Sequence, residues 1–190
     1  FRNNDLPGVM QGTAAQRLIG LYGVRPGKRA VVLTANAHGY GVALDLIEAG
    51  VEVATVADLR PTLGDSAMAE AVAAQGGPIM TSQRISAAVA GPGKRHVAGA
   101  LLCPEDATDK VSRKTQCRVE CDLICMSPGY TPTFQLALQA GGQLGYNDDT
   151  AYFSITNLPN SLRLAGSVDG IFDLDAALTA GRRAGWQAAR

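Results

Sequence analysis

Two glycine-containing turns are the places in this sequence where a nucleotide could bind. The first turn reads TANAHGYG and follows AVVLT, a run of apolar residues at 30–34. A dinucleotide-binding turn in this position has the pattern G-x-G-x-x-G, which lets backbone amides and a helix N-terminus approach a pyrophosphate. Here only Gly39 and Gly41 are present, and Asn36 and His38 fill positions that should be small. The pattern favours a Rossmann shape without the ligand over a turn that binds a nucleotide.

An acidic residue accompanies this first turn. Asp58 ends the next apolar stretch, VEVATVAD at 51–58, about twenty residues further on, where an acid that binds a ribose would lie. His38 could act as a catalytic base, but a single histidine in a loop is more often incidental. His96 is expected in an exposed hairpin, in contact with solvent.

The second turn lies in LAGSVDGIFDLDAALTAG at 164–181. An apolar strand is expected at 162–165, Gly166 allows a close backbone approach, and Gly170 gives a second bend. A helix then starts near 173–175. Strand, glycine and helix N-terminus in this order are typical of an anion-binding site. Asp173 could contact a ribose or a water linked to a diphosphate, and it could equally cap the helix.

Other catalytic patterns are missing from the sequence. Cys117, Cys121 and Cys125 are spaced by four, whereas zinc sites usually begin with C-x2-C, so we expect core cysteines and no metal. No C-x-x-C dithiol, Ser-His-Asp set, H-E-x-x-H or P-loop occurs. We therefore assign no catalytic residue to this chain.

The elements that position the two turns alternate between strands and helices. A strand at 30–34, a helix at 39–49 and a strand at 51–58 form a βαβ unit. A helix at 66–75, a strand pair spanning 78–105 and a strand at 121–126 follow. A short helix at 133–140 and an Ala-rich helix at 175–190 complete the pattern, which predicts an α/β fold.

Length and composition exclude several classes of protein. The chain has 190 residues, 46% of them hydrophobic, and 17 Lys+Arg balance 17 Asp+Glu. A net charge of zero argues against nucleic-acid binding. No apolar run reaches the roughly 18 residues of a membrane span. Few cysteines favour a reducing compartment, so we expect a cytoplasmic protein.

The composition also predicts two domains. Residues 28–126 read as a compact βαβ-plus-hairpin module. Residues 1–27 and 127–190 read as the second half of an outer domain into which that module is inserted. Since the chain opens at Phe1, we expect it to be cut from a longer protein. The incomplete outer half would expose apolar surface, so self-association is expected.

Several segments together resemble one family. These are NNDLPGVM, the link YGV-x-PGKRAVV, the strand end ATVADLR, CDLICMSPGYTPT and LRLAGSVDGIFDLDAALTAG. They are similar to the α (large) subunit of the heterotetrameric bacterial sarcosine oxidases, over essentially the whole chain. Within that subunit the region resembles thioredoxin reductase. The resemblance implies a Rossmann-like, three-layer FAD/NAD(P)-binding-type fold with an inserted βαβ-plus-hairpin domain.

The resemblance also implies an activity and cofactors. The family oxidises sarcosine to glycine, formaldehyde and hydrogen peroxide, and tetrahydrofolate can accept the one-carbon unit on a region absent here. FAD and FMN are implied mainly on the β subunit, and the γ and δ subunits are further partners. The α subunit is implied to hold NAD in its outer domain. A large subunit of an opine or amino-acid dehydrogenase complex, or an interaction module without nucleotide, are the alternatives.

The resemblance implies which residues of this chain contact NAD. They are Gly166, Gly170, Ile171 and Asp173, which form part of the site. A protein similar to thioredoxin reductase would have Gly-Asp at 166 and 167, whereas this chain has Gly-Ser. Flavin binding is therefore not expected here.

Overall fold

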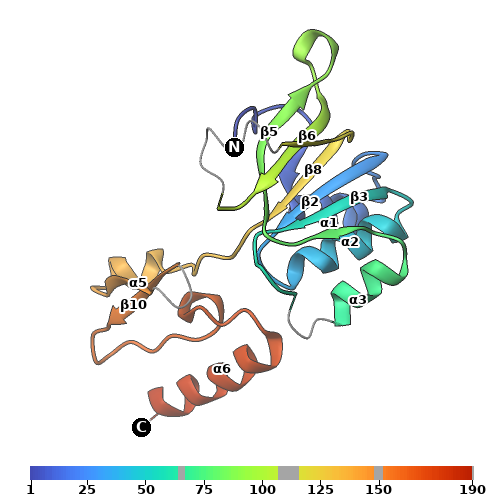
Figure 1. Cartoon of the computed structure of the whole chain (residues 1–190). Helices are drawn as coiled ribbons and strands as arrows, with labels where there is room; N and C mark the ends of the chain where they lie inside the picture. The colour runs from blue at the N-terminus through green and yellow to red at the C-terminus, as the bar shows by residue number, and fades with distance from the viewer. Residues whose placement is uncertain (64–66, 107–115, 148–151, 190) are drawn as a thin grey trace. The chain divides into compact units, whose positions relative to one another are not determined.

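A computed structural model describes residues 1–63, 67–106, 116–147 and 152–189. The chain forms two compact units, residues 1–129 (unit 1) and 130–190 (unit 2). Figure 1 follows the chain through both.

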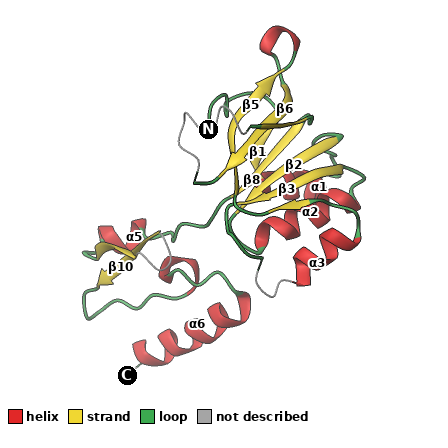
Figure 2. Ribbon diagram, in the orientation of Figure 1, coloured by secondary structure: helices red, strands yellow, loops and turns green. Residues whose placement is uncertain are grey.

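Unit 1 is built on a parallel sheet whose strands lie in the order β1-β8-β2-β3-β4. The bounds of these strands are β1 (Val9–Gln11), β2 (Arg29–Thr34), β3 (Glu52–Asp58), β4 (Ile79–Met80) and β8 (Leu123–Ser127). From β2 the chain moves outward through β3 to β4, and later returns to place β8 between β2 and β1 (Figure 2). β2 is a continuous apolar run because both faces of this sheet are covered.

Three helices cover one face of the parallel sheet: α1 (Gly12–Tyr22), α2 (His38–Glu48) and α3 (Ala67–Ala74). α2 contributes most of the contact, through the fully buried side chains of Tyr40 and Leu46. These side chains share a core cluster with Val32 of β2 and Val56 of β3. Burial of this face, and not capping, holds α2 in place, since no side chain caps its N-terminus.

An antiparallel sheet covers the opposite face. It consists of β5 (Gln83–Ala90), β6 (Val97–Pro104) and β7 (Cys117–Val119), with a short 3-10 turn, η1 (Pro92–Lys94), at the tip of the β5–β6 hairpin. Ile85 and Leu102 of this sheet share a core cluster with Val31 and Leu33 of β2. Unit 1 is therefore a three-layer structure, as the sequence predicts. The predicted strand pair at 78–105 differs in detail, because Ile79–Met80 joins the parallel sheet instead.

The compact units divide the chain at a different point from the predicted domains, and the domain assignment stays a prediction. Residues 1–27, expected to join 127–190 in an outer domain, lie in unit 1. β1 pairs in parallel with β8, and Asn3 Nδ2 donates a hydrogen bond to Ala88 O at 3.0 Å. The turn before β1 needs Gly8, whose φ is +105° and where a Cβ would lie 2.6 Å from Asp122 O.

Unit 2 contains α5 (Gln135–Gln139), an antiparallel pair of strands β9 (Gln143–Asn147) and β10 (Tyr152–Asn157), a 3-10 turn η2 (Gly166–Asp169) and α6 (Leu174–Ala188). The prediction of a strand at 162–165 is wrong, since these residues are irregular. A strand needs a neighbour to take its backbone hydrogen bonds, and β9 and β10 use each other. The last helix of this unit, α6, contains no buried residue.

Candidate functional site

The carboxyl ends of β2 and β8 mark the first candidate site. Strand order reverses there, and open α/β sheets bind ligands in the crevice at such a switch point. The last residues of the two strands, Thr34 and Ser127, are register partners. The turn TANAHGYG leaves β2 at this edge, so the predicted position of the first turn is correct.

The side chains of this first turn contact the end of β8. Thr34 Oγ1 donates towards the carbonyl oxygens of Asn36 (2.9 Å) and Ser127 (3.1 Å), and Asn36 Nδ2 donates to Ser127 O at 3.2 Å. His38 Nδ1 lies 3.0 Å from Ser127 Oγ. Burial lowers the pKa of His38, and the charge of Asp45 offsets this only in part, so the imidazole is neutral at pH 7.

The serine–histidine contact resembles the first half of a nucleophilic site. Ser127 is buried, however, so a substrate carbonyl does not reach its hydroxyl from solvent. Its carbonyl oxygen already binds two side chains of the turn. The contact orders the turn, and we assign it no catalytic role.

Asp58 is not available to a ribose. Its side chain is fully buried, and Oδ1 accepts hydrogen bonds from Arg60 N (2.9 Å) and Nε (3.1 Å). Oδ2 accepts from Arg60 Nη2 (2.7 Å) and Tyr40 Oη (2.5 Å). Burial raises the pKa of Asp58, but the hydrogen bonds from Arg60 and Tyr40 outweigh burial, and the net pKa lies below the usual value.

The second candidate site is the turn around η2 in unit 2. Gly166 and Gly170 have φ of +69° and +72°, in the left-handed region that favours glycine. A Cβ on Gly170 would lie 2.9 Å from Tyr152 Oη, so this glycine serves packing. A Cβ on Gly166 would meet only Ala177 Cβ, at 4.0 Å, so the backbone at Gly166 remains open to an approaching group.

Asp173 caps α6. Its Oδ1 accepts a hydrogen bond from Ala176 N at 2.9 Å, which satisfies one of the free amides of the first turn. Of the two roles that the sequence left open for Asp173, the capping role is present in the structure. Asp175 adds a second carboxylate in that turn.

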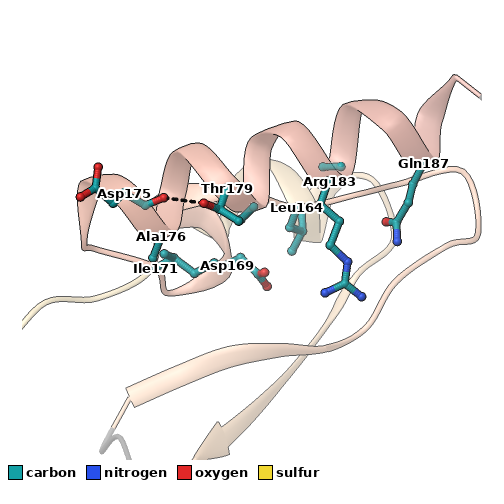
Figure 3. A pocket seen from close by; sticks show the side chains of 10 residues that line it. Leu164, Asp169, Ile171, Asp175, Ala176, Thr179, Arg183 and Gln187 are labelled. Carbon is teal, nitrogen blue, oxygen red and sulfur yellow. Dashed lines mark hydrogen bonds between the residues drawn. The ribbon is translucent and has the colours of Figure 1, made fainter.

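A cavity of about 670 Å³ lies beside this turn, between residues 164–171 and α6 (Figure 3). Ile171 lines it, whereas Gly166, Gly170 and Asp173 do not. Figure 3 shows Asp169 and Arg183 on the same side of α6, with the apolar side chain of Leu164 nearby. The volume lies within the range of small-molecule sites.

The lining suits a dinucleotide in part. Asp169 offers acceptors for ribose hydroxyls, Arg183 offers a cation for a phosphate, and Leu164 and Ile171 offer apolar surface. Neither Asp169 nor Arg183, both of which line the cavity, is among the site residues predicted from the sequence. A signal for this lining was available in the sequence. Every fourth residue of α6 lies on one face of the helix, and the residues of this face that line the cavity are Asp175, Thr179, Arg183 and Gln187.

The cysteines form no metal centre. Among the described residues, no three of His, Cys, Asp and Glu gather as a metal ion would require. Cys103, Cys121 and Cys125 are buried, and burial raises the pKa of both Cys121 and Cys125 to about 12. Cys117 is exposed.

The chain is similar to known proteins in sequence and in fold. It is 32% identical over 189 residues to sarcosine oxidase subunit alpha of Corynebacterium sp. (strain P-1), which covers 100% of this chain and 19% of that relative. It is 28% identical over 188 residues to sarcosine oxidase subunit alpha of Rhizobium meliloti (strain 1021), covering 95% and 17%. This confirms the predicted resemblance. The chain spans about a fifth of the length of these relatives.

The crystal structure of T. acidophilum thioredoxin reductase has the same fold. It matches with a TM-score of 0.65 at 18% identity, over 85% of this chain and 51% of that one. The predicted α/β, FAD/NAD(P)-binding-type fold is thereby confirmed. No protein-family model matches. Within the described ranges, no helix has the length and apolarity needed to cross a membrane.

Proposed function

We propose that this chain serves in an oxidoreductase of the sarcosine oxidase type, as part of its α subunit. The observation that carries the proposal is similarity over the whole chain to sarcosine oxidase α subunits, at up to 32% identity. The reaction of the assembled enzyme converts sarcosine, O2 and water to glycine, formaldehyde and hydrogen peroxide. Tetrahydrofolate, bound elsewhere, takes the one-carbon unit as methylene-tetrahydrofolate.

The role of this chain in that enzyme is to bind NAD and to hold subunits together, not to oxidise the substrate. FAD and FMN act mainly on the β subunit, and the γ and δ subunits complete the assembly. The described residues support this division, because Ser127, whose hydroxyl lies beside His38, is buried, and no three metal-ligating side chains gather among them. NAD supplies hydride-transfer chemistry where it is bound.

Unit 2 contributes part of the NAD site. Gly166 leaves its backbone open, Gly170 turns the chain, and Ile171 and Asp173 lead into α6. The cavity beside them adds Arg183, a cation that can pair with a diphosphate. Further residues of the longer protein complete this dinucleotide-binding domain around the exposed faces of unit 2.

The test uses the full-length protein together with the subunits that purify with it. Gly166→Leu is compared with Gly23→Leu, since Gly23 has a similar φ of +61° and also has open space around it. Both variants place a side chain at a positive φ, so both carry similar backbone strain. We expect Gly166→Leu to release NAD while the flavin content stays unchanged, and Gly23→Leu to retain NAD. Retention of NAD by Gly166→Leu would contradict the site.

A second pair avoids backbone strain altogether. Arg183 lines the cavity and its neighbour Arg182 does not. Arg183→Gln should lower the NAD content, and Arg182→Gln should leave it unchanged. Hydrogen peroxide release with sarcosine, proline and opines then identifies the substrate. Release with proline or an opine, and none with sarcosine, would overturn the proposed reaction.

A further inference from the structure

The first turn keeps one glycine position of a dinucleotide-binding turn and replaces the other two. The sequence alone indicates Asn36 and His38 as the replaced positions. The close approach of Gly39 to Thr34 instead sets the G-x-G-x-x-G spacing so that its first two positions are Thr34 and Asn36. The third glycine of that pattern allows close packing of helix and strand. Gly39 does this here, since a Cβ on it would overlap the side chain of Thr34. The packing of the fold is kept, but the position of the tight turn, Thr34, and the position where the backbone approaches a pyrophosphate, Asn36, both carry side chains.

Those two side chains bridge the crevice between β2 and β8. Thr34 Oγ1 and Asn36 Nδ2 both reach Ser127 O, at 3.1 and 3.2 Å. Asn36 N donates to Thr34 Oγ1 at 3.2 Å, so this amide is not free for a phosphate oxygen. Asn36 Oδ1 is buried and has no hydrogen-bond partner. This atom is an acceptor, and phosphate oxygens are acceptors too, so it does not favour a pyrophosphate.

The ribose position is filled as well. Asp58 receives four hydrogen bonds, three from Arg60 and one from Tyr40, which use the four lone-pair sites that a carboxylate has, roughly two on each oxygen. Tyr40 and Asp58 are fully buried, so a ribose hydroxyl reaches neither of them. Binding a ribose here would require Arg60 or Tyr40 to give up a hydrogen bond in a buried place, which is costly.

We infer that the switch-point crevice of unit 1 is closed to dinucleotides by the chain's own side chains. Thr34 and Asn36 close the pyrophosphate position, and the Tyr40–Asp58–Arg60 cluster closes the ribose position. These residues fix α2 and the ends of β2, β3 and β8 to one another. The fold of unit 1 implies a dinucleotide, and the residues of the turn do not fit one. This inference stands apart from the NAD site proposed in unit 2.

Hydrogen–deuterium exchange on the 190-residue chain tests the inference. The chain is mixed separately with NAD+, NADH, NADPH and FAD at about 1 mM, enough to detect even weak sites. We expect no added protection at residues 34–41 and 58–60 with any of the four. Protection confined to 164–187 also agrees with the inference, since it reports the site in unit 2. Added protection at 34–41 or 58–60 would overturn it.

Tyr40→Phe tests the role of the cluster, with Tyr22→Phe as its control because Tyr22 is exposed. Because the Tyr40 hydroxyl stabilises the buried cluster, Tyr40→Phe should lower the melting temperature by about 2–4 °C. Hydrogen exchange at residues 34–41 of this variant should be the same with and without added nucleotide. Tyr22→Phe leaves the melting temperature unchanged. A Tyr40→Phe variant that melts like the wild type contradicts the assigned role.

Discussion

The Tyr40 hydroxyl donates a hydrogen bond of 2.5 Å to Asp58 Oδ2, and both side chains are fully buried. The bond joins the first turn of α2 to the last residue of β3. Burial, followed by the hydrogen bond to Asp58, raises the pKa of Tyr40 well above its usual value, so the phenol stays protonated and remains a donor.

Asp58→Asn should lower the free energy of unfolding at pH 7 by about 2–3 kcal/mol, because the amide leaves Arg60 without a buried counter-charge. The folded-state pKa of Asp58 is lowered, so the stabilisation is complete above the unfolded-state value of about 3.9 and is lost as the pH falls through the folded-state value. Urea unfolding between about pH 7 and pH 2 measures both effects. Equal pH dependence in wild type and variant would contradict this account.

Gly39→Ala should destabilise unit 1 by about 1–3 kcal/mol, since the new Cβ overlaps Thr34 and the contact is buried. Gly41→Ala, two residues later in the same helix, is the control. Its Cβ would meet only Met68 Sδ, at 3.8 Å, and alanine favours a helix by up to about 1 kcal/mol over glycine. Thermal unfolding should therefore move in opposite directions for the two variants. A shift in the same direction would argue against the close packing of α2 on β2.

His38 should titrate below the usual value for histidine, because its partial burial disfavours the imidazolium. The folded-state pKa is lowered, so the neutral ring stabilises the fold fully above about pH 6.5, and this stabilisation is lost as the pH falls from there towards the folded-state pKa. NMR titration of the imidazole signals measures the value, with His96→Gln to assign them. A value for His38 above about 6.5 would contradict the prediction.

One cysteine thiol should react with a thiol reagent much faster than the other three. Cys117 is exposed, and Cys103, Cys121 and Cys125 are buried. A thiolate is the reactive form, and burial raises the pKa of Cys121 and Cys125 to about 12. An aromatic disulfide reagent at pH 8 should therefore modify Cys117 in the folded chain and all four cysteines after unfolding. Cys117→Ser should abolish the fast reaction. Fast labelling of the folded Cys117→Ser variant would contradict the burial of the three remaining cysteines.

The sequence predicts a helix or strand most accurately where the segment's own apolar pattern is enough to identify it. The βαβ unit at 30–58 is confirmed because its strands are apolar runs and its helix has a buried face. The turn residues of NNDLPGVM conceal β1, since only the pairing with β8 makes Val9–Gln11 a strand. β9 and β10 were missed in the same way. The strand expected at 162–165 is absent because the described part of unit 2 contains no strand that pairs with it.

The candidate sites show the same limit. Asp58 was recognised from its spacing as an acid near a ribose, yet its role depends on Tyr40 and Arg60, which the spacing alone does not assign. The sequence Asp-Leu-Arg at 58–60 was the available signal, since an arginine two residues after an acid can reach back to it. The NAD contacts of Gly166, Gly170, Ile171 and Asp173 stay a prediction.

The place of β8 in the sheet of unit 1 has a consequence for the order of folding. A ribosome makes β1 and β2 early and β8 last, yet β8 lies between them. The gap between β1 and β2 therefore stays open until residue 127 has left the exit tunnel, and β1 has no partner until then. Contacts so distant along the chain slow folding. Until β8 arrives, the nascent chain exposes two strand edges that a chaperone or a neighbouring chain can bind.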